Sequence, residues 1–499
     1  MAKRELTRRQ QIALQEWRIL DLVKKDFRVF CQVAWERSNP NMPLTWNWHL
    51  DYLCECLEAL SEGRFHNLLI NIAPRSFKST LVSIYYPCWE WLREPHNRFL
   101  CLSYSAALAI EHSQIRRSLI RQDWYQAAAE GKCLLKSDKN RLDEYENVSG
   151  GAMISRGLDG SVLGSGGNRI LIDDPNSPED AYSQAERESR SRKFREYVTT
   201  RKNSPDTRLL LIQQRIAEGD CSGIVLDELD TPDTPWFKAI VPTRAPDDID
   251  VEYPISGKVY HRRKGSLMHP ERHSEVEDAA ARLALGSFGY SARHDQRPAP
   301  SSGGVFEAGW FKQFDPEQVE ATLFDRGEFV LSLDTSFGSE AEQASYNVLG
   351  LYGVAYPNFY VLDLWRKKCS YVELKRAISV FIGSWVERLG FAPHKFLIEV
   401  KATGQPLISE LKQTYQYIIP VNPKASKEAR TQAISPTVEA GRLWVPNSAN
   451  WRHSFIHEFI TYPKGENDDQ IDATSQLIAH YMRVWARRQS QYGTRMTHF

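Results

Sequence analysis

The feature that most constrains the fold is a repeated alternation of short apolar runs with helical stretches. From Asn67 onward the apolar runs are NLLINIA, RFLCLSYS, NRILIDD and TRLLLIQQRI, and helical segments separate them. Apolar strands divided by helices are typical of a mainly parallel sheet that is covered on both faces. The pattern therefore predicts an α/β domain over residues 66–245.

The same alternation begins again after a break. EFVLSLDTSF, VLGLYGV, NFYVLDLW and KFLIEV have the character of strands, with a helix before the last of them. A chain of 499 residues also exceeds what one hydrophobic core usually supports. We predict a second α/β domain over residues 326–485, a connector over 246–325, a helical N-terminal region over 1–65 and a basic tail over 486–499.

Composition excludes few partners. Lys and Arg total 63 and Asp and Glu total 63, so the formal net charge is zero. Phosphate binding depends on local basic surface, so DNA stays possible as a partner. The eight cysteines are scattered without a CxxC pair, as expected of reduced thiols used in packing. No run approaches the ~20 apolar residues of a membrane span, so we expect a cytoplasmic protein.

The first candidate site is the segment IAPRSFKST, residues 72–80, which follows a predicted strand and opens a helix. Backbone N–H groups at such a helix start can cradle phosphates together with a lysine, and a serine hydroxyl can reach Mg²⁺. Ile72 and Phe77 fill both glycine positions of GxxxxGK[ST], so a solvated turn is the alternative. The predicted nucleotide-binding residues here are Arg75, Ser76, Phe77, Lys78, Ser79 and Thr80.

Paired acids end the later strand RILIDD. We expect Asp173 to hold Mg²⁺ and Asp174 to orient or deprotonate the attacking water, although paired acids can also cap a turn. The next strand places Gln214 at its carboxyl end, where it could sense the γ-phosphate. Transition-state charge also needs an arginine. Four candidates for that arginine are Arg75, Arg116, Arg117 and Arg156.

The second candidate site is a set of acids in the rear domain. Asp334 ends one strand, Glu399 ends another, and three acids start the last helix. Two Mg²⁺ or Mn²⁺ ions in a phosphodiesterase need several hard oxygen ligands. An RNase H-like fold places its first acid on the opening strand in the same way. The predicted metal ligands are Asp334, Glu399, Asp468, Asp469 and Asp472. Four of these, Asp334, Glu399, Asp469 and Asp472, are also predicted to be catalytic.

Several features of this domain allow a second interpretation. The acids at 468–472 could merely cap a helix, and Asp363 is interpreted as structural. The basic residues of the stretch 424–430 and of the C-terminal tail could grip DNA phosphates or form solvated faces. Those residues are Lys424, Lys427, Arg430, Arg483, Arg487, Arg488 and Arg495.

The motifs, taken in order, resemble those of tailed-phage terminase large subunits. The segments that carry the resemblance cover most of residues 45–480: WHLDYLCECLEAL, PRSFKST, LIDDP, QQRIAEGDCSG, HPERHSEVEDAAARLALGSFGYSARHDQRP, FVLSLDTSFG, EVKATGQPLISEL and NDDQIDATSQ. The resemblance implies a P-loop ATPase domain of the RecA/ASCE type that uses ATP and Mg²⁺, followed by an RNase H-like nuclease that uses two Mg²⁺ or Mn²⁺ ions.

The resemblance also implies partners. These are double-stranded DNA, a portal protein of the procapsid, a small terminase subunit that contacts the N-terminal region, and further copies of the chain in a ring, all in the host cytoplasm. Two departures stand out, since Phe77 replaces a glycine and Asp174 stands where many relatives carry Glu. Two alternatives stay open: an ATP-coupled helicase or repair nuclease, and a non-enzymatic DNA-binding assembly protein.

Overall fold

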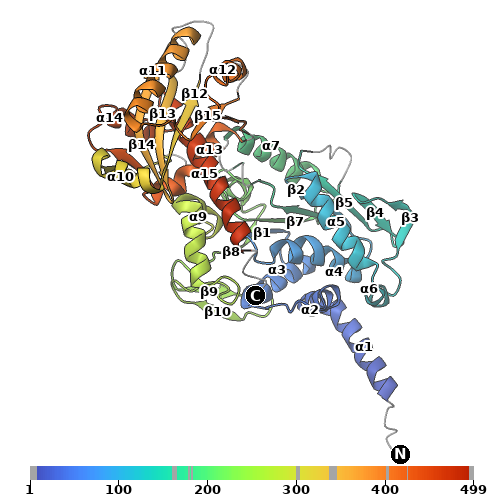
Figure 1. Cartoon of the computed structure of the whole chain (residues 1–499). Helices are drawn as coiled ribbons and strands as arrows, with labels where there is room; N and C mark the ends of the chain where they lie inside the picture. The colour runs from blue at the N-terminus through green and yellow to red at the C-terminus, as the bar shows by residue number, and fades with distance from the viewer. Residues whose placement is uncertain are drawn as a thin grey trace, which may run out of the picture. The chain divides into compact units, whose positions relative to one another are not determined.

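The computed structural model describes residues 8–159, 166–177, 180, 184–298, 304–335, 346–400, 404–423 and 425–493. Two compact units make up the chain (Figure 1). Unit 1 comprises Met1–Arg282 and Ser287–Pro300, and unit 2 comprises Leu283–Gly286 and Ser301–Phe499. Both units are α/β. None of the described helices combines the length and the hydrophobicity that a bilayer crossing requires.

Unit 1 is built on an eight-stranded sheet. Its strands, from one edge to the other, are β3 (Leu135–Asn140), β4 (Glu144–Asn147), β5 (Ala152–Gly157), β2 (Arg98–Ser103), β6 (Arg169–Asp173), β7 (Arg208–Gln213), β1 (Asn67–Ile72) and β8 (Trp236–Val241). The six strands from β5 to β8 run parallel, and β3 and β4 extend the sheet antiparallel. The mainly parallel sheet agrees with the alternation of strands and helices in the sequence.

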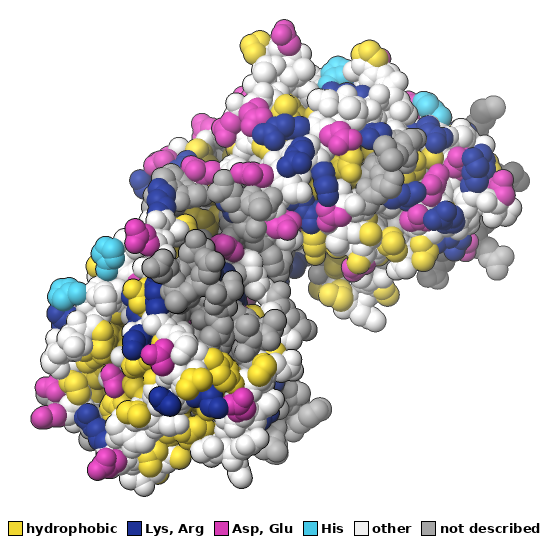
Figure 2. Space-filling model, turned by 90° about the horizontal axis from the view of Figure 1, so that it is seen from above, with side chains coloured by type: hydrophobic (Ala, Val, Ile, Leu, Met, Phe, Trp, Pro, Cys, Tyr) yellow, Lys and Arg dark blue, Asp and Glu magenta, His cyan; other side chains and the backbone are white. Residues whose placement is uncertain are grey.

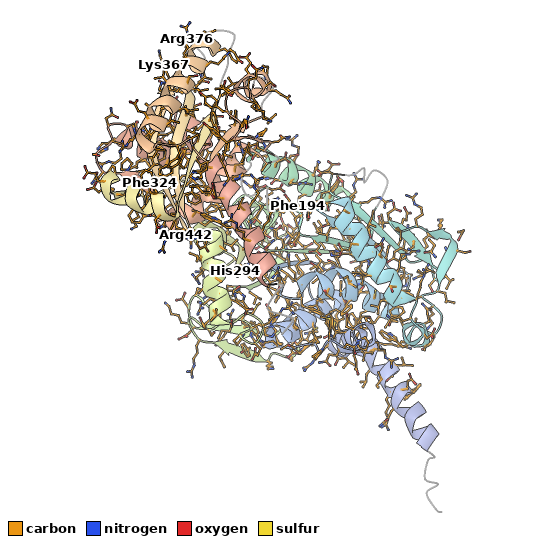
Figure 3. All side chains as sticks on the ribbon, in the orientation of Figure 1. Phe194, His294, Phe324, Lys367, Arg376 and Arg442 are labelled. Carbon is orange, nitrogen blue, oxygen red and sulfur yellow. The ribbon has the colours of Figure 1, made fainter. Side chains whose placement is uncertain are left out.

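Helices cover both faces of this sheet. One face of β1 packs Leu68 and Ile70 into a cluster with the N-terminal helices, and the other packs Leu69 against Phe194 and its neighbours (Figure 3). All six residues of β1 are buried, as expected in the middle of a parallel sheet. The helices are α1 (Arg8–Lys25), α2 (Phe27–Ser38), α3 (Trp48–Glu62), α4 (Tyr86–Arg93), α5 (Ala106–Ile120), α6 (Asp123–Ala128), α7 (Gln184–Thr200) and α8 (Cys221–Ile224).

Residues 242–298 follow the last strand of this sheet. They include the hairpin of β9 (Ile249–Glu252) and β10 (Val259–Arg262) and the helix α9 (Glu275–Arg293). Helix α9 begins with a capping box between Ser274 and Glu277, which satisfies free N–H groups of its first turn. It is interrupted at Gly286, whose φ of 65° and ψ of 175° are not helical.

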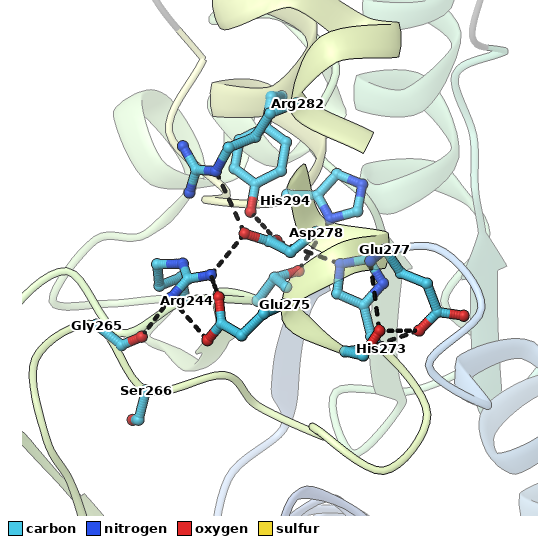
Figure 4. Close-up of polar contacts among 12 residues, drawn as sticks. Arg244, Gly265, Ser266, His273, Glu275, Glu277, Asp278, Arg282 and His294 are labelled. Atoms are coloured by element: carbon cyan, nitrogen blue, oxygen red, sulfur yellow. Dashed lines mark hydrogen bonds and ion pairs between the residues drawn. The ribbon is translucent and has the colours of Figure 1, made fainter. Parts of the chain in front are cut away.

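Asp278 is the centre of a polar hub on α9 (Figure 4). Its buried carboxylate accepts hydrogen bonds from the Tyr290 hydroxyl, from Nη2 of Arg244 at 2.7 Å and from Nε of Arg282 at 3.3 Å. Burial alone would raise the pKa of Asp278, but these hydrogen bonds lower it well below its usual range. The hub therefore attaches α9 to the segment after β8.

The hub also brings together groups that are able to bind a metal. Atoms of His273, Asp278 and His294 lie within 4.8 Å of one another. The ring of His294 stacks on that of Tyr290 at a centroid distance of 4.6 Å. Because two guanidinium groups already neutralise Asp278, a divalent cation would meet their repulsion. We interpret the hub as structural.

Unit 2 is built on a seven-stranded sheet. Its order is β11 (Lys312–Phe314), β17 (Leu443–Pro446), β14 (Asn358–Lys367), β13 (Asn347–Ala355), β12 (Glu328–Asp334), β15 (Lys395–Glu399) and β16 (Ile418–Val421). Strands β12, β13 and β14 form an antiparallel meander, and β15 and β16 join β12 in parallel. The carboxyl ends of β12, β14 and β15 therefore lie at one edge of the sheet.

Two apolar clusters occupy the two faces of this sheet. Val330 packs with residues of the later helices, and Leu331 packs with residues of the earlier ones. On the first face Oγ of Ser332 donates a hydrogen bond of 2.6 Å to the carbonyl of Ala473, which fixes the last helix. The helices are α10 (Pro316–Arg326), α11 (Tyr371–Leu389), α12 (Gly404–Leu411), α13 (Lys427–Glu439), α14 (Arg452–Thr461) and α15 (Asp469–Gly493).

Charged side chains of both signs are interspersed over the face seen in Figure 2. This agrees with the zero net charge of the sequence. Attraction for an anionic partner must therefore come from local groups.

Candidate functional sites

The loop after β1 has a strained backbone. Arg75 and Phe77 have φ angles of 60° and 68°, and Asp174 at the end of β6 has a φ of 41°. These are three of the five described non-glycine residues with positive φ. Such conformations cost on the order of 1–3 kcal/mol each, persist only where the surroundings impose them, and cluster at functional sites. The strained backbone therefore indicates a candidate functional site at this edge of the sheet.

Phe77 shows how the loop tolerates a side chain at a position where the GxxxxGK[ST] motif has glycine. Its ring packs edge-on against Trp35, at a centroid distance of 5.3 Å, and against Tyr85, at 6.0 Å. Aromatic pairs of this kind contribute about 0.5–1.5 kcal/mol beyond burial, comparable to the cost of the positive φ. A π-helical turn, η1 (Thr80–Tyr85), follows the loop and leads into α4.

Trp35 also lines a cavity of about 460 Å³ beside the loop. Pro40, Leu44 and Trp46 supply apolar walls, and Gln32 supplies an amide. The indole N–H of Trp35 donates to the carbonyl of Met42 at 2.7 Å, which fixes the ring. A flat apolar pocket with an amide at its rim suits an aromatic heterocycle.

Lys78 and Asp174 form the centre of the first site. The ammonium group of Lys78, which is 6% exposed, contacts the carboxylate of Asp174. The backbone N–H of Gln214 donates to the same carboxylate at 3.2 Å. Burial raises the pKa of Asp174 above its ordinary value, and Lys78 opposes that shift. A half-buried carboxylate with a raised pKa is suited to accept a proton.

Side chains from the loop region and from α5 hold the carboxylate of Asp173 in place. Its Oδ2 accepts a hydrogen bond of 2.5 Å from Oγ of Ser83 and lies 3.6 Å from Nδ1 of His112. Its Oδ1 lies 3.4 Å from Oγ of Ser79. Burial lowers the pKa of His112 to about 4, so the ring is neutral at pH 7. A serine hydroxyl and a fixed carboxylate in this arrangement fit a hydrated Mg²⁺.

Ser83 and His112 are additions to the predicted set. Ser83 lies one helical turn after Ser79, so helical spacing could have identified it. His112 comes from α5 and has no signal in the sequence. Ser76 has a local role, because its hydroxyl donates to the carbonyl of Ala73 at 2.7 Å, and Thr80 begins the π-helical turn.

The structure distinguishes the four candidate arginines. Arg116 is fully buried and donates to Oγ of Ser155 at 2.6 Å, and Arg117 donates to Oδ1 of Asn140 at 2.6 Å. Arg156 forms ion pairs with two acids of its own sheet region. Arg75 is exposed on the loop itself. Of the four, only Arg75 is both exposed and part of the loop.

The second site lies at the edge of the unit 2 sheet. Asp334 and Glu399 end the neighbouring parallel strands β12 and β15, and Asp472 is in the first turn of α15. They are 4%, 5% and 3% exposed. Buried carboxylates of this kind need cations as partners.

Two basic residues of α13 supply positive charge. Nζ of Lys427 lies 2.5 Å from Asp468 and 2.6 Å from Asp472. Nη1 of Arg430 lies 3.3 Å from Glu399, and its Nη2 lies 3.9 Å from Asp472. Three of the predicted acids, Glu399, Asp468 and Asp472, thus meet the same pair of cations.

The pKa shifts separate the acids of α15. Burial and the nearby charge of Asp334 raise the pKa of Asp472 to about 6. Burial and the charge of Glu458 raise the pKa of Asp469 to about 6. Asp472 therefore belongs with Asp334, whereas Asp469 lies on the side of Glu458, a residue that the sequence did not single out.

The acids fit hard divalent cations. Oδ1 of Asp472 is buried, and within the described part of the chain it has no hydrogen-bond partner. Nη2 of Arg430 lies 3.9 Å away, beyond hydrogen-bonding distance, so this oxygen keeps its lone pairs for a ligand such as Mg²⁺ or Mn²⁺. The predicted phosphate-gripping residues Arg483, Arg487 and Arg488 are exposed on α15, whereas Lys424 and Arg495 lie outside the described residues. Asp363 accepts a hydrogen bond of 3.0 Å from Trp385 and is structural.

Residues 331–481 match the family model described as "Terminase RNaseH-like domain". No curated protein sequence matches the chain. The large terminase of a thermophilic bacteriophage, solved in complex with ADP, is 12% identical, with a TM-score of 0.50 over 87% of this chain and 98% of that one. A second crystal form of it is 11% identical, with a TM-score of 0.51 over 88% and 100%.

The crystal structure of the same thermophilic-phage terminase with ATP-γ-S also matches, at 12% identity and a TM-score of 0.50 over 87% and 98%. Together these matches confirm the predicted fold class. The chain has the α/β fold of a phage large terminase, and residues 331–481 carry its RNase H-like domain.

Proposed function

We propose that this chain, whose residues 331–481 carry a terminase RNase H-like domain, is the large subunit of a tailed-phage DNA-packaging terminase. In this role it hydrolyses ATP to move double-stranded DNA into a procapsid, and it cuts concatemeric DNA. The observation that carries the proposal is the presence of two acidic sites in one chain. Asp174 faces Lys78 of a strained loop, and Asp472 of α15 lies near Asp334 at the end of β12.

The first site is suited to ATP. The phosphates would lie on the loop beside Lys78, with Mg²⁺ between Ser79 and Asp173. Asp174 would take the proton of the attacking water, and its bond to the backbone of Gln214 would transmit the change to β7. Arg75 would meet the transition-state charge. The cavity beside Trp35 would hold the adenine. The thermophilic-phage terminase was solved in complex with ADP and with ATP-γ-S, which supports a nucleotide as a ligand of this fold.

The second site is suited to cutting a phosphodiester. Asp334, Glu399 and Asp472 would hold two Mg²⁺ or Mn²⁺ ions, with Asp468 and Asp469 as further ligands. When bound, the metals supply an activated water and stabilise the leaving oxygen. Lys427 and Arg430 already lie among the acids, so they would face the negative charge of the scissile phosphate.

The proposed function also implies partner molecules. In this role the chain would form a ring on the portal protein in the host cytoplasm and receive its DNA from a small terminase subunit. A helicase or repair nuclease would need no portal, so binding to a purified portal ring separates these alternatives.

The test is cleavage of supercoiled plasmid with Mg²⁺ or Mn²⁺, with ATP hydrolysis recorded on the same samples. Wild type is compared with Asp334→Ala and with Asp363→Asn, a matched acid that lies in the sheet but outside the site. We expect Asp334→Ala to lose cleavage and keep ATP hydrolysis, and Asp363→Asn to keep both. A folded wild type with neither activity would support the non-enzymatic assembly protein.

A further inference from the structure

A cavity of about 650 Å³ lies in unit 2. Its walls come from the end of β14, from α14 and from the loop between α14 and α15. The polar lining includes Ser454, His457, Thr461 and Asn467, two cations, Arg366 and Lys464, and two acids, Glu458 and Glu466. We call it the side cavity. No residue of the predicted metal set lines it, so it needs an explanation of its own.

The side cavity adjoins the nuclease acids. Glu458 in its wall accepts hydrogen bonds from the backbone N–H groups of Gln470, at 2.6 Å, and Ile471, at 3.4 Å. Those groups belong to the turn of α15 that carries Asp469 and Asp472. Asn467 in the lining directly precedes Asp468. A ligand in the cavity would therefore lie beside the metal ligands.

The sheet register places Arg366 in line with Asp334. Asp334 of β12 pairs with Val348 of β13, and Val348 pairs with Arg366 of β14. Directly paired residues lie on the same face of a sheet, and adjacent strands are about 4.8 Å apart. The backbone of Arg366 is thus about 10 Å from that of Asp334 along one row. Lys367, labelled in Figure 3, marks this end of β14.

The chemistry of Arg366 indicates an anionic ligand. Its guanidinium lies 4.0 Å from the ring centroid of Tyr346 and pairs with Glu458 at 3.1 Å, which holds it in place. Its Nη2 is the atom that pairs with Glu458, whereas its buried Nε makes no hydrogen bond within the described part of the chain. A guanidinium that is held in place and has an unused donor is suited to a phosphate oxygen.

The rest of the lining suits a nucleoside. Hydroxyl and amide groups of Ser454, Thr461 and Asn467 can hydrogen-bond a sugar or a base, and the exposed ring of His457 can stack on a base. The volume lies within the range of small-molecule sites. One nucleotide fits these features better than a bare phosphate does.

We propose that the side cavity holds one nucleotide of the DNA strand that is being cut, with Arg366 at its phosphate. This subsite rests on the proposed nuclease function. Duplex DNA advances about 3.4 Å per nucleotide along its axis, so 10 Å corresponds to about three nucleotides from the scissile bond. The subsite fixes the strand without touching the reacting atoms, and it acts on DNA binding.

The experiment measures cleavage of a fluorescein-labelled 30-base-pair duplex by the full-length protein with Mn²⁺, as initial rates against DNA concentration. Arg366→Gln removes the charge. Ser454→Trp fills the cavity from α14 and leaves the Arg366–Glu458 pair intact. Arg326→Gln is the matched control. Arg326 is exposed and lies just before the start of β12, whereas Asp334 lies at the other end of that strand.

We expect KM to rise about tenfold in Arg366→Gln, the equivalent of losing one charge-assisted hydrogen bond, while kcat changes less than about twofold. Ser454→Trp should raise KM about threefold or more, and Arg326→Gln should leave both constants unchanged. Unchanged KM in the first two variants would overturn the proposal. A fall in kcat alone in Arg366→Gln would also overturn it, because Arg366 would then act at the reacting atoms.

Anisotropy of the same duplex with Ca²⁺ separates this proposal from the proposed function. Weaker binding by both cavity variants, with a wild type that binds but cannot cut with Mn²⁺, would support the subsite and contradict the nuclease. Equal binding by wild type and both variants would contradict the subsite, whatever the cleavage result.

Discussion

Nζ of Lys427 lies 2.6 Å from Oδ2 of Asp472, so α13 supplies the cation for a carboxylate that is only 3% exposed. Burial and Asp334 raise the pKa of Asp472 to about 6, and Lys427 acts in the opposite direction. In the proposed nuclease site, the proton on Asp472 would compete with a metal for the same oxygen atoms. The protonation state of this one pair would therefore control when the second site binds its ions.

Lys427→Met should move the acid limb of the cleavage profile to higher pH. In wild type the limb should be centred near pH 6, where Asp472 loses its proton. Without the nearby ammonium group the pKa of Asp472 rises further, by about one unit. Plasmid cleavage at a fixed, subsaturating Mn²⁺ concentration, from about pH 5 to about pH 8, measures the shift. Lys375→Met, on α11 at the other face of the sheet, should leave the limb in place.

Asp472→Asn should stabilise the metal-free protein at neutral pH. A carboxyl whose folded pKa is raised holds its proton in the folded state after the unfolded chain has released it. Its stabilising contribution is therefore complete below about pH 4 and is lost as pH rises through about 6. Urea unfolding with EDTA should show wild type losing about 1–3 kcal/mol across this window relative to the variant. Mg²⁺ should restore stability in wild type alone.

Lys78→Ala should separate the two activities. The variant removes the cation that contacts Asp174 and would hold the phosphates, so ATP hydrolysis should fall about a hundredfold or more. Metal-dependent plasmid cleavage uses residues of another unit and should stay within about threefold. Loss of cleavage in a variant with a normal melting curve would contradict two independent sites.

Arg75→Ala should have a far larger effect on ATP turnover than Arg117→Ala or Arg156→Ala. An arginine that meets the transition-state charge contributes about 10³-fold or more to kcat. Arg117 and Arg156 are bound to Asn140 and to acids of β4 and its preceding turn, so their loss should change kcat by only a few fold. Steady-state ATPase assays compare the three. Equal effects would show that the finger lies elsewhere.

Asp278→Asn should destabilise unit 1. The variant leaves Arg244 and Arg282 without the buried carboxylate that they share, and breaking a buried pair costs about 3 kcal/mol. Thermal unfolding monitored by circular dichroism measures the loss. Glu271→Gln, on the exposed segment before α9, is the control and should change the midpoint little.

The fold class could be predicted because its signals are local. Parallel buried strands appear as continuous apolar runs, and β1, β6 and β7 are of this kind. Acids that end parallel strands lie at one edge of their sheet. The sequence could therefore predict Asp173 as a site residue of the first sheet, and Asp334 and Glu399 as site residues of the second. The positions of these elements follow from residues close together in the chain.

The partners of those acids could not be predicted, because they come from tertiary packing. Nothing near His112 in the sequence indicates Asp173, and nothing near Arg366 indicates Asp334. The link from Arg366 to Asp334 depends on the register of three strands. The tolerance of Phe77 at positive φ likewise depends on Trp35. This residue belongs to α2, and both α3 and β1 lie between α2 and the loop in the chain.

The separation of the nuclease acids along the chain affects biosynthesis. Asp334 ends the first strand of the meander, whereas Asp472 begins the last described helix. A ribosome must therefore synthesise the chain through Asp472 before these carboxylates can meet. Under the proposed nuclease function, a nascent chain that stops before α15 would lack the third acid and would be unable to cut DNA.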